Sequence, residues 1–235
     1  MIMTIETQVK SNISHVEAET QVTSRVATWL TKLVYPLAKY LVFPLFFKEV
    51  IITGQENVPS DGAVIIAPTH RSRWDALVVP YATGRLVSGR DPHFMVSENE
   101  IKGLQGWFIT RLGGFPIDTT HPGFSSLKHS FDLLSQGEMV VIFPEGNIFR
   151  TETVKPLKRG IAKIALEVAI AHPETNIKIL PVSVKYSEAI PKRGCSVEIK
   201  IGECVEVSQY PPNADRENSL KLTKDLENAL KAIHE

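Results

Sequence analysis

The pattern of hydrophobic and polar positions changes twice along the 235-residue chain. Residues 1–24 are mostly polar and lack the apolar core and cleavage site of a signal peptide, so we expect a polar leader. Residues 25–52 form the most apolar stretch, with large side chains at the i, i+3, i+4, i+7 spacing of an amphipathic helix. From residue 53 onward, strand-like and helix-like segments alternate. The chain therefore divides into a leader, a helical segment at 25–52 and one domain at 53–235.

The helical segment is long enough for a bilayer span, which needs about 20 apolar residues. Lys32 and Lys39 interrupt it, however, and each such charge costs about 2.5–3.5 kcal/mol at the centre of a spanning helix. Pro36 and Pro44 predict a kink or a division into two helices. We expect an amphipathic segment that seats the protein in the membrane interface. The alternative is a helix packed on the protein's own core.

The domain at 53–235 predicts an α/β fold with a mixed central sheet flanked by helices. Two short apolar runs, residues 63–67 and 139–143, have the composition of buried strands. Further strands are expected at 93–96, 177–186 and 196–201. Helices are expected from Asp75 onward and at 106–112, 124–136, 160–171 and 218–233, the last of them covering the sheet.

Charge and cysteine content exclude several classes of protein. The 26 basic residues equal the 26 acidic ones, whereas nucleic-acid binders usually carry a basic excess, so no nucleic-acid partner is expected. Cys195 and Cys204 are too few for a disulfide framework and lack further ligands at zinc-site spacing. We therefore expect a reducing compartment, no metal and no cofactor.

The first candidate site follows the predicted strand at 63–67. His70 lies where the strand gives way to a loop, and Asp75 lies where the next helix begins. A tight strand-to-helix turn would bring the carboxylate to one ring nitrogen, leaving the other nitrogen as a general base. The alternative is that Asp75 only caps its helix and His70 is a solvated loop residue. For a lone His-x4-Asp pair, this alternative is the more common outcome.

The second candidate site, residues 143–150, follows the predicted strand at 139–143. Gly146 permits a turn that would expose backbone amides toward an anion, and Glu145 would either orient an acceptor hydroxyl or lock the loop. Arg150 offers a bidentate fork for phosphate. The alternative is a plain turn with both charged residues in solvent.

A third candidate is the glycine-rich stretch at 111–118. Arg111 would provide a second phosphate contact, and Gly113 and Gly114 would let the backbone approach a ligand closely. The alternative is a simple helix stop.

Taken together and in this order, these motifs resemble the glycerolipid acyltransferase family, typified by 1-acylglycerol-3-phosphate acyltransferases. His70 and Asp75 match the His-x4-Asp block of the family. Residues 113–118 match its glycine-rich block ending in Phe-Pro-Ile-Asp, residues 143–146 its Phe-Pro-Glu-Gly block, and residues 179–182 its apolar-Pro-Val block. The resemblance spans roughly residues 54–207, and it makes the domain an acyltransferase domain.

The resemblance implies an enzyme that moves a fatty acyl group from acyl-CoA or acyl-carrier protein to the free hydroxyl of 1-acylglycerol-3-phosphate, giving phosphatidic acid. His70, oriented by Asp75, would remove the hydroxyl proton. Arg111 and Arg150 would hold the acceptor phosphate. It also implies a membrane surface as partner, at the cytoplasmic face of an inner or plastid-type membrane.

The same resemblance assigns substrate contacts to the two glycine-containing loops. Glu145 would help to orient the acceptor, and amides near Glu145–Gly146, or near Gly113 and Gly114, would stabilise the oxyanion.

Two departures leave the acceptor open. Many relatives follow the Glu-Gly pair with Thr-Arg-Ser, whereas residues 147–149 separate Gly146 from Arg150 here. The aspartate of the glycine-rich block is often followed by arginine, and here Thr119 follows it. Glycerol-3-phosphate, another lyso-lipid, a hydrolytic reaction and an inactive lipid-binding homologue are the alternatives. A serine hydrolase is disfavoured because no Gly-x-Ser-x-Gly motif occurs.

Overall fold

The computed structural model describes residues 24–117 and 124–235. The expectation of a polar leader and the assignment of Asp118 to the glycine-rich block lie outside the described residues. The strands are β1 (Glu49–Thr53), β2 (Val64–Pro68), β3 (His93–Ser97), β4 (Gly114–Ile117), β5 (Met139–Val141), β6 (Lys178–Tyr186), β7 (Ser196–Ile201) and β8 (Val205–Glu206). The α-helices are α2 (Thr28–Leu37), α3 (Phe43–Phe46), α4 (Asp75–Thr83), α5 (Arg85–Ser88), α6 (Gly103–Arg111), α7 (Phe124–Ser135), α8 (Gly160–Ala171) and α9 (Arg216–His234). A π-helical turn, η1 (Ala38–Val42), joins α2 to α3.

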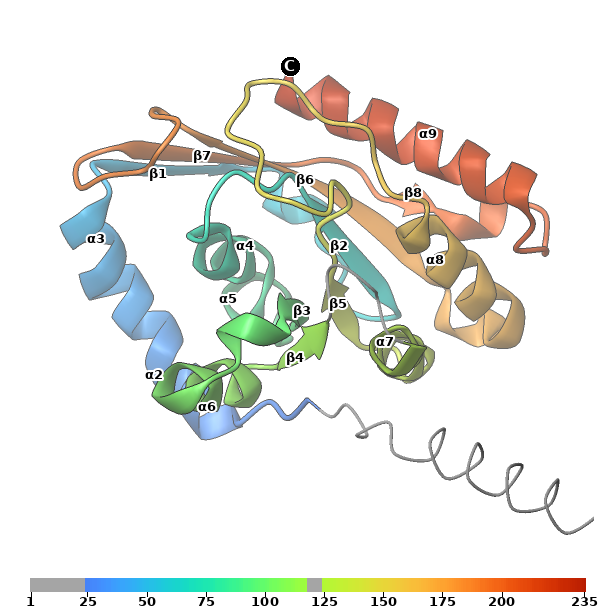
Figure 1. The fold of residues 1–235 in the computed structure, drawn as a ribbon, viewed down its shortest axis with the longest axis horizontal. Helices are drawn as coiled ribbons and strands as arrows, with labels where there is room; N and C mark the ends of the chain where they lie inside the picture. The colour runs from blue at the N-terminus through green and yellow to red at the C-terminus, as the bar shows by residue number, and fades with distance from the viewer. Residues whose placement is uncertain (1–23, 118–123) are drawn as a thin grey trace, which may run out of the picture.

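These strands form one mixed sheet in the order β1-β7-β6-β2-β5-β3-β4, with β8 beside β6 (Figure 1). The five strands from β6 to β4 are parallel to one another. β7 runs antiparallel to β6, and β1 runs parallel to β7. The predicted α/β class, a mixed central sheet flanked by helices, is confirmed.

Both faces of the sheet are covered, which explains why the central strands β2 and β5 are apolar at every position. Ile65 and Ala67 of β2 face a core shared with α7, α8 and α9. Val64 and Ile66 of the same strand face a second core, which includes residues of α3 and α4. Figure 1 shows these two helical layers on either side of the sheet. β2 is buried at all five positions and is paired on both sides, with β5 and β6, so the start of the loop that follows β2 is fixed with it.

The helices α2, η1 and α3 form an N-terminal arm, residues 28–47, along one flank of the domain (Figure 1). Phe43 and Phe47 are buried, and they pack against Tyr81 and Trp74 of the next helical region, with ring centroids 4.8 and 5.2 Å apart. One face of the arm therefore packs on the protein's own core, which was the alternative given for this segment.

The outer side of the same arm is exposed and apolar. Its side chains recur about every four residues: Trp29, Leu33, Leu37, Leu41 and Leu45. Within the described residues, no helix is both long and apolar enough to cross a bilayer. The arm therefore has one face on the core and another in solvent, and seating in a membrane stays a prediction.

Three strands were not expected from the sequence: the two-residue β8 and the two edge strands, β1 and β4. Residues 49–52 belong to β1, so the boundary between segments at residue 52 falls inside an edge strand and not at the end of a helix. Residues 114–117, expected as part of a glycine-rich loop, form β4 at the other edge. Pro116 is compatible with that place because an edge strand leaves one row of backbone groups unpaired.

Candidate active site

The candidate site lies at the carboxyl ends of two neighbouring parallel strands. β2 leads into the loop that carries His70, and β5 leads into residues 143–150. The carboxyl ends of parallel strands meet at one edge of the sheet, where α/β proteins commonly bind ligands. The two loops touch directly, since the backbone N–H of Phe149 donates to the carbonyl of His70 at 2.8 Å. Two of the three stretches singled out in the sequence are thus brought together.

His70 and Asp75 are in direct contact, with Nδ1 of the ring 2.9 Å from Oδ2 of the carboxylate. Asp75 is fully buried as the first residue of α4. Its Oδ2 also accepts the backbone N–H groups of Arg71, at 2.6 Å, and Ser72, at 2.9 Å. These bonds fold residues 70–75 back on themselves, which is the tight turn that the spacing required.

The contact also sets the tautomer of His70. Oδ2 of Asp75 is an acceptor toward two backbone amides, so it accepts from the ring as well, and we assign the proton to Nδ1. Nε2 then carries a lone pair. Phe143 stacks on the ring with centroids 3.9 Å apart, which restrains the plane of the imidazole. The arrangement is that of a general base held in one orientation.

A second partner of Asp75 was not foreseen from the sequence. The hydroxyl of Tyr186, at the end of β6, donates to Oδ1 of Asp75 at 2.7 Å. Burial and the neighbouring Asp75 charge raise the pKa of Tyr186 far above its ordinary value, so the hydroxyl keeps its proton. Because β6 pairs with β2, the predicted strand at 177–186 was the one feature of the sequence that could have indicated a place for Tyr186 near Asp75.

Glu145 is buried and points into the protein, away from solvent. Its carboxylate accepts the backbone N–H of His70 at 2.9 Å, Nη1 of Arg71 at 2.6 Å and the backbone N–H of Lys155 at 2.8 Å. Of the two roles expected for Glu145, locking the loop is the one that this geometry shows. Arg71, which sequence reasoning passed over, is its buried ionic partner.

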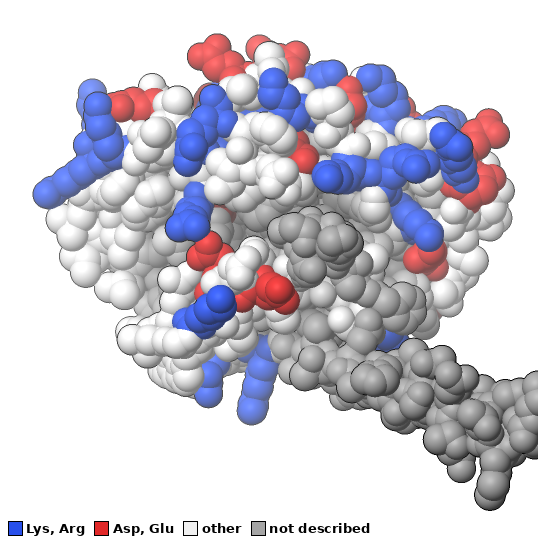
Figure 2. Space-filling model, viewed as in Figure 1, with Lys and Arg blue, Asp and Glu red and all other residues white. Residues whose placement is uncertain are grey.

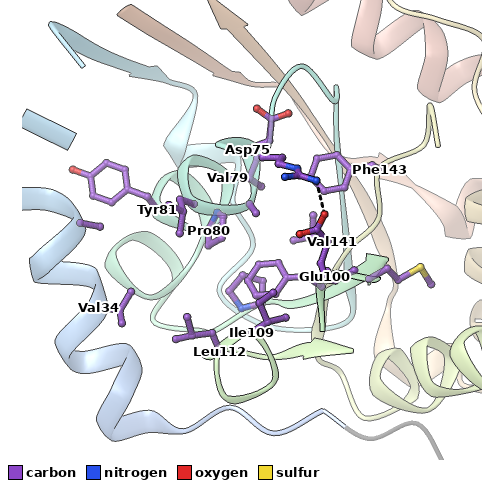
Figure 3. Close-up of a pocket in the computed structure, with 18 of the residues that line it drawn as sticks. Val34, Asp75, Val79, Pro80, Tyr81, Glu100, Ile109, Leu112, Val141 and Phe143 are labelled. Atoms are coloured by element: carbon purple, nitrogen blue, oxygen red, sulfur yellow. Dashed lines mark hydrogen bonds and ion pairs between the residues drawn. The ribbon is translucent and has the colours of Figure 1, made fainter. Parts of the chain in front are cut away.

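A cavity of about 550 Å³ opens beside His70. It extends between the N-terminal arm, α4 and the β3–α6 region, so that Val34, Val79 and Leu112 all contribute to its wall (Figure 3). The wall is mostly apolar, and it includes Asp75 and Phe143, both of which contact His70. Arg73 and Glu100 form an ion pair of 2.6 Å at this wall, drawn as a dashed line in Figure 3.

The remaining predicted residues occupy different places. Arg111 stacks on Trp107, 4.1 Å from the ring centroid, and is not a wall residue of the cavity. Gly113 and Gly114 are buried, packed near Pro92 and Ile109, and contribute nothing to the wall. The structure therefore separates these three residues from the cavity.

Gly146 and Arg150 lie on the loop that touches His70, and both are exposed. Gly146 has a φ of 79°, and its N–H bonds the carbonyl of Phe143 at 3.1 Å, so this amide serves the turn. A side chain at position 146 would collide with the stem of Lys158.

The described residues contain no group of three histidine, cysteine, aspartate or glutamate side chains arranged to hold a metal ion.

Comparison with known proteins gives consistent results. The family model described as Acyltransferase matches residues 49–185. A 1-acyl-sn-glycerol-3-phosphate acyltransferase of Bacillus subtilis is 34% identical over 120 residues, covering 48% of this chain and 55% of that protein. A protein of the same name from Streptococcus pneumoniae is 25% identical over 161 residues, covering 65% of this chain and 54% of that protein. The chain thus spans about half the length of these curated relatives.

Among solved structures, the 1-acyl-sn-glycerophosphate (LPA) acyltransferase of Thermotoga maritima superposes with a TM-score of 0.63. The match covers 87% of this chain and 78% of the other, at 23% identity. The chain therefore shares its fold with this solved structure, in addition to the family motifs found in its sequence.

Proposed function

The chain belongs to the acyltransferase family, and from this premise we propose that it moves a fatty acyl group from a thioester to the free hydroxyl of 1-acylglycerol-3-phosphate. The product is phosphatidic acid. The observation that carries this proposal is the His70–Asp75 pair in the wall of an apolar cavity. The names of the curated relatives support the choice of acceptor.

The reaction is a direct transfer with one base. Nε2 of His70 takes the proton as the acceptor O–H bond breaks, and the oxygen attacks the thioester carbonyl. The new C–O ester bond forms, the C–S bond breaks, and the imidazolium returns its proton to the leaving sulfur. Asp75 stabilises the imidazolium between these two transfers, without itself becoming protonated.

The cavity suits the acyl chain of a lipid substrate. A pocket of about 550 Å³ lined mainly by apolar side chains removes a hydrocarbon chain from water, at roughly 0.8 kcal/mol per buried CH₂. His70 at one end then lies beside the reacting carbonyl or hydroxyl.

The acceptor phosphate is assigned to the exposed loop that touches His70. Arg150 is exposed on this loop, and Lys158 lies beside Gly146 of the same loop. Both offer a cation on the solvent side of the buried Glu145. Arg111, stacked on Trp107 outside the cavity wall, has a weaker claim than the sequence suggested.

A membrane surface is the proposed partner, and the exposed side of the N-terminal arm is the proposed contact. α6 lies next to the start of the arm, where the N–H of Ala27 donates to the carbonyl of Arg111, and it carries three more exposed apolar side chains, Leu104, Trp107 and Phe108. In Figure 2 most charged side chains lie over the upper part of the molecule, and the flank with α2 and α3 is mainly uncharged. We place the enzyme on the cytoplasmic face of its membrane, where soluble acyl donors are available.

The test is acyl transfer from labelled acyl-CoA, and in parallel from acyl-carrier protein, to 1-acylglycerol-3-phosphate in mixed micelles. The wild type is expected to form labelled phosphatidic acid, and His70→Ala is expected to lose roughly 10²–10⁴-fold in rate. Equal activity of the two proteins would refute the role of His70.

Other products decide between the remaining alternatives. Transfer to glycerol-3-phosphate instead would move the chain toward relatives such as the Glycerol-3-phosphate O-acyltransferase 1 of Saccharomyces cerevisiae. Release of free fatty acid, with no diacyl product, would indicate a hydrolase. No reaction with any lyso-acceptor would favour an inactive lipid-binding protein.

A further inference from the structure

The last residue of α9, His234, lies directly behind the loop that carries His70. Its side chain is only 1% exposed. Nε2 of the ring is 3.3 Å from Nη2 of Arg71, and Nδ1 is 2.8 Å from the hydroxyl of Ser183 on β6. The histidine is therefore held between the central sheet and the loop, more than 150 positions from His70 in the sequence.

These two contacts determine the protonation of the ring. A guanidinium only donates hydrogen bonds, so Nε2 of His234 is the acceptor in its contact with Arg71. Nδ1 then carries the proton and donates it to Ser183. Burial, together with the charges of Arg71, Lys185 and Lys200, lowers the pKa of His234 to about 4. The ring is neutral near pH 7, as the contact with Arg71 demands.

Arg71 connects His234 to the active site. Its side chain is buried, with Nη1 donating to Glu145 at 2.6 Å and to the carbonyl of His70 at 3.2 Å. Nη2 donates to the carbonyl of Thr153 at 3.2 Å as well as to His234. Glu145 in turn accepts the backbone N–H of His70. Both the N–H and the carbonyl of His70 are thus fixed by the Arg71–Glu145 pair.

A buried guanidinium depends on having acceptors for its N–H groups, because each unmet donor carries a desolvation penalty. Nε of Arg71 is already buried without a hydrogen-bond partner among the described residues. Loss of the His234 acceptor would leave Nη2 with only the Thr153 carbonyl. The guanidinium would then turn toward other acceptors, and the backbone of His70 would move with it.

We propose that neutral His234 is a positioning residue for acyl transfer, which acts by orienting Arg71 and, through Glu145, the backbone of His70. This inference rests on the proposed function. His234 touches no reacting atom, so its removal changes the placement of the base and leaves substrate binding intact. A misplacement of about 1 Å at a reacting group costs up to roughly 10²-fold in rate.

The experiment compares wild type, His234→Ala and His234→Gln by steady-state kinetics. His234→Ala is expected to lower kcat by roughly 10–100-fold, with KM for donor and acceptor within about threefold of wild type. The glutamine oxygen can accept from Arg71 where Nε2 does now, so His234→Gln is expected to restore most of kcat. Equal kcat losses in the two variants, or a higher KM at unchanged kcat, would overturn the proposal.

The matched control is Leu230→Val on the same helix. Leu230 is fully buried and belongs to the core between α8 and α9, so this variant loosens the packing of α9 while leaving Arg71 untouched. It is expected to lower the melting temperature and to keep the wild-type kcat below that temperature. A kcat loss in Leu230→Val equal to that in His234→Ala would show that the effect is loosening of the helix, and would overturn the proposal.

A readout without substrate separates this inference from the proposed function. In side-chain 15N–1H spectra at pH 7, His234 is expected as a neutral ring protonated at Nδ1, and Arg71→Lys is expected to shift its Nε2 resonance. A protonated ring or the Nε2–H tautomer would overturn the proposal whatever the enzyme's substrate. If the wild type gives the expected spectrum but transfers no acyl group, the contact of His234 is as described and the proposed function is wrong.

Discussion

At the scale of single residues, the buried carboxylate of Asp75 is the centre of the site. It accepts from the ring of His70, from two backbone amides of the loop and from the hydroxyl of Tyr186. The three donors other than the ring stabilise the negative charge next to His70. They also fix the carboxylate, so that the ring it orients has one position.

The hydroxyl of Tyr186 offers a direct test of this network. Tyr186→Phe would leave Oδ1 of Asp75 buried without its donor, at a cost of about 1–3 kcal/mol in the free energy of unfolding. The remaining donors to Oδ2 keep Asp75 in contact with His70, so we expect most of the activity to remain. Chemical denaturation measures the free energy of unfolding, and acyl-transfer kinetics measure the activity. An unchanged free energy of unfolding would contradict the described contact.

Glu145 distinguishes loop locking from substrate binding. Glu145→Gln would leave the buried guanidinium of Arg71 without its charged partner, and such losses cost about 3–5 kcal/mol. We expect a marked fall in the free energy of unfolding, with the KM for acceptor unchanged in the protein that stays folded. A stable variant with a raised acceptor KM would restore the idea that Glu145 holds the substrate.

The sequence reveals some of these residues and hides others for a physical reason. His70 and Asp75 lie five positions apart, so local turn geometry is enough to predict their contact. Tyr186 reaches Asp75 only because β6 pairs with β2, and His234 reaches Arg71 only because α9 packs on the sheet. Burial, which settles the role of Glu145, is a property of the folded chain and leaves no mark at one position.

At the scale of elements, the N-terminal arm has two jobs on opposite faces. Its inner face supplies Val34 and Tyr35 to the cavity wall, and its outer face carries the exposed apolar stripe. A periodicity analysis detects an amphipathic helix here and cannot tell two apolar faces apart, since both consist of large apolar residues. The strands β1 and β4 were missed because one continues an apolar run and the other contains Gly114 and Pro116.

Membrane seating by the outer face predicts a specific loss of binding. Leu33→Ser with Leu41→Ser removes two exposed leucines from the arm and leaves the buried face intact, so we expect weaker sedimentation with anionic liposomes at an unchanged melting temperature. Deletion of residues 25–52 is a poorer test, because it also removes a cavity wall and most of the edge strand β1.

The matched control changes exposed apolar residues elsewhere. Ile170→Ser with Leu220→Ser alters side chains that are 44% and 47% exposed on α8 and α9, the helices that pack in the core on the other face of the sheet from the arm. This pair is expected to sediment as the wild type does. Equal losses in the two double variants would show that general surface hydrophobicity, and not the arm, drives the association.

At the scale of the whole molecule, two buried histidines make stability depend on pH. His93, bonded through Nδ1 to Ser24, has its pKa lowered to about 4 by burial and by nearby His129, against a weaker opposing effect of Asp91. His234 is lowered to the same value. Between their ordinary pKa of 6.5 and about 4, the unfolded chain binds more protons than the folded one.

Stability is therefore complete above pH 6.5 and is lost as the pH falls toward 4. On going from about pH 7 to pH 5, we expect each histidine to reduce the free energy of unfolding by roughly 1–2 kcal/mol. Denaturant titrations at the two pH values measure the combined effect of the two histidines on the free energy of unfolding. His93→Asn is expected to have a clearly smaller difference between the two, and an identical difference would contradict the role of His93.

The edge strand β1 also constrains how the protein is made. Glu49 of β1 pairs with Ser196 of β7, so the strand has no partner until most of the domain has been synthesised. Until then the arm before it lacks part of its packing surface, because Phe47 also packs on Tyr186 at the end of β6. A nascent chain in this state exposes the most apolar surface, and we expect this surface to bind a nearby bilayer or a chaperone. The arm would then meet a lipid surface before the sheet beside it is complete.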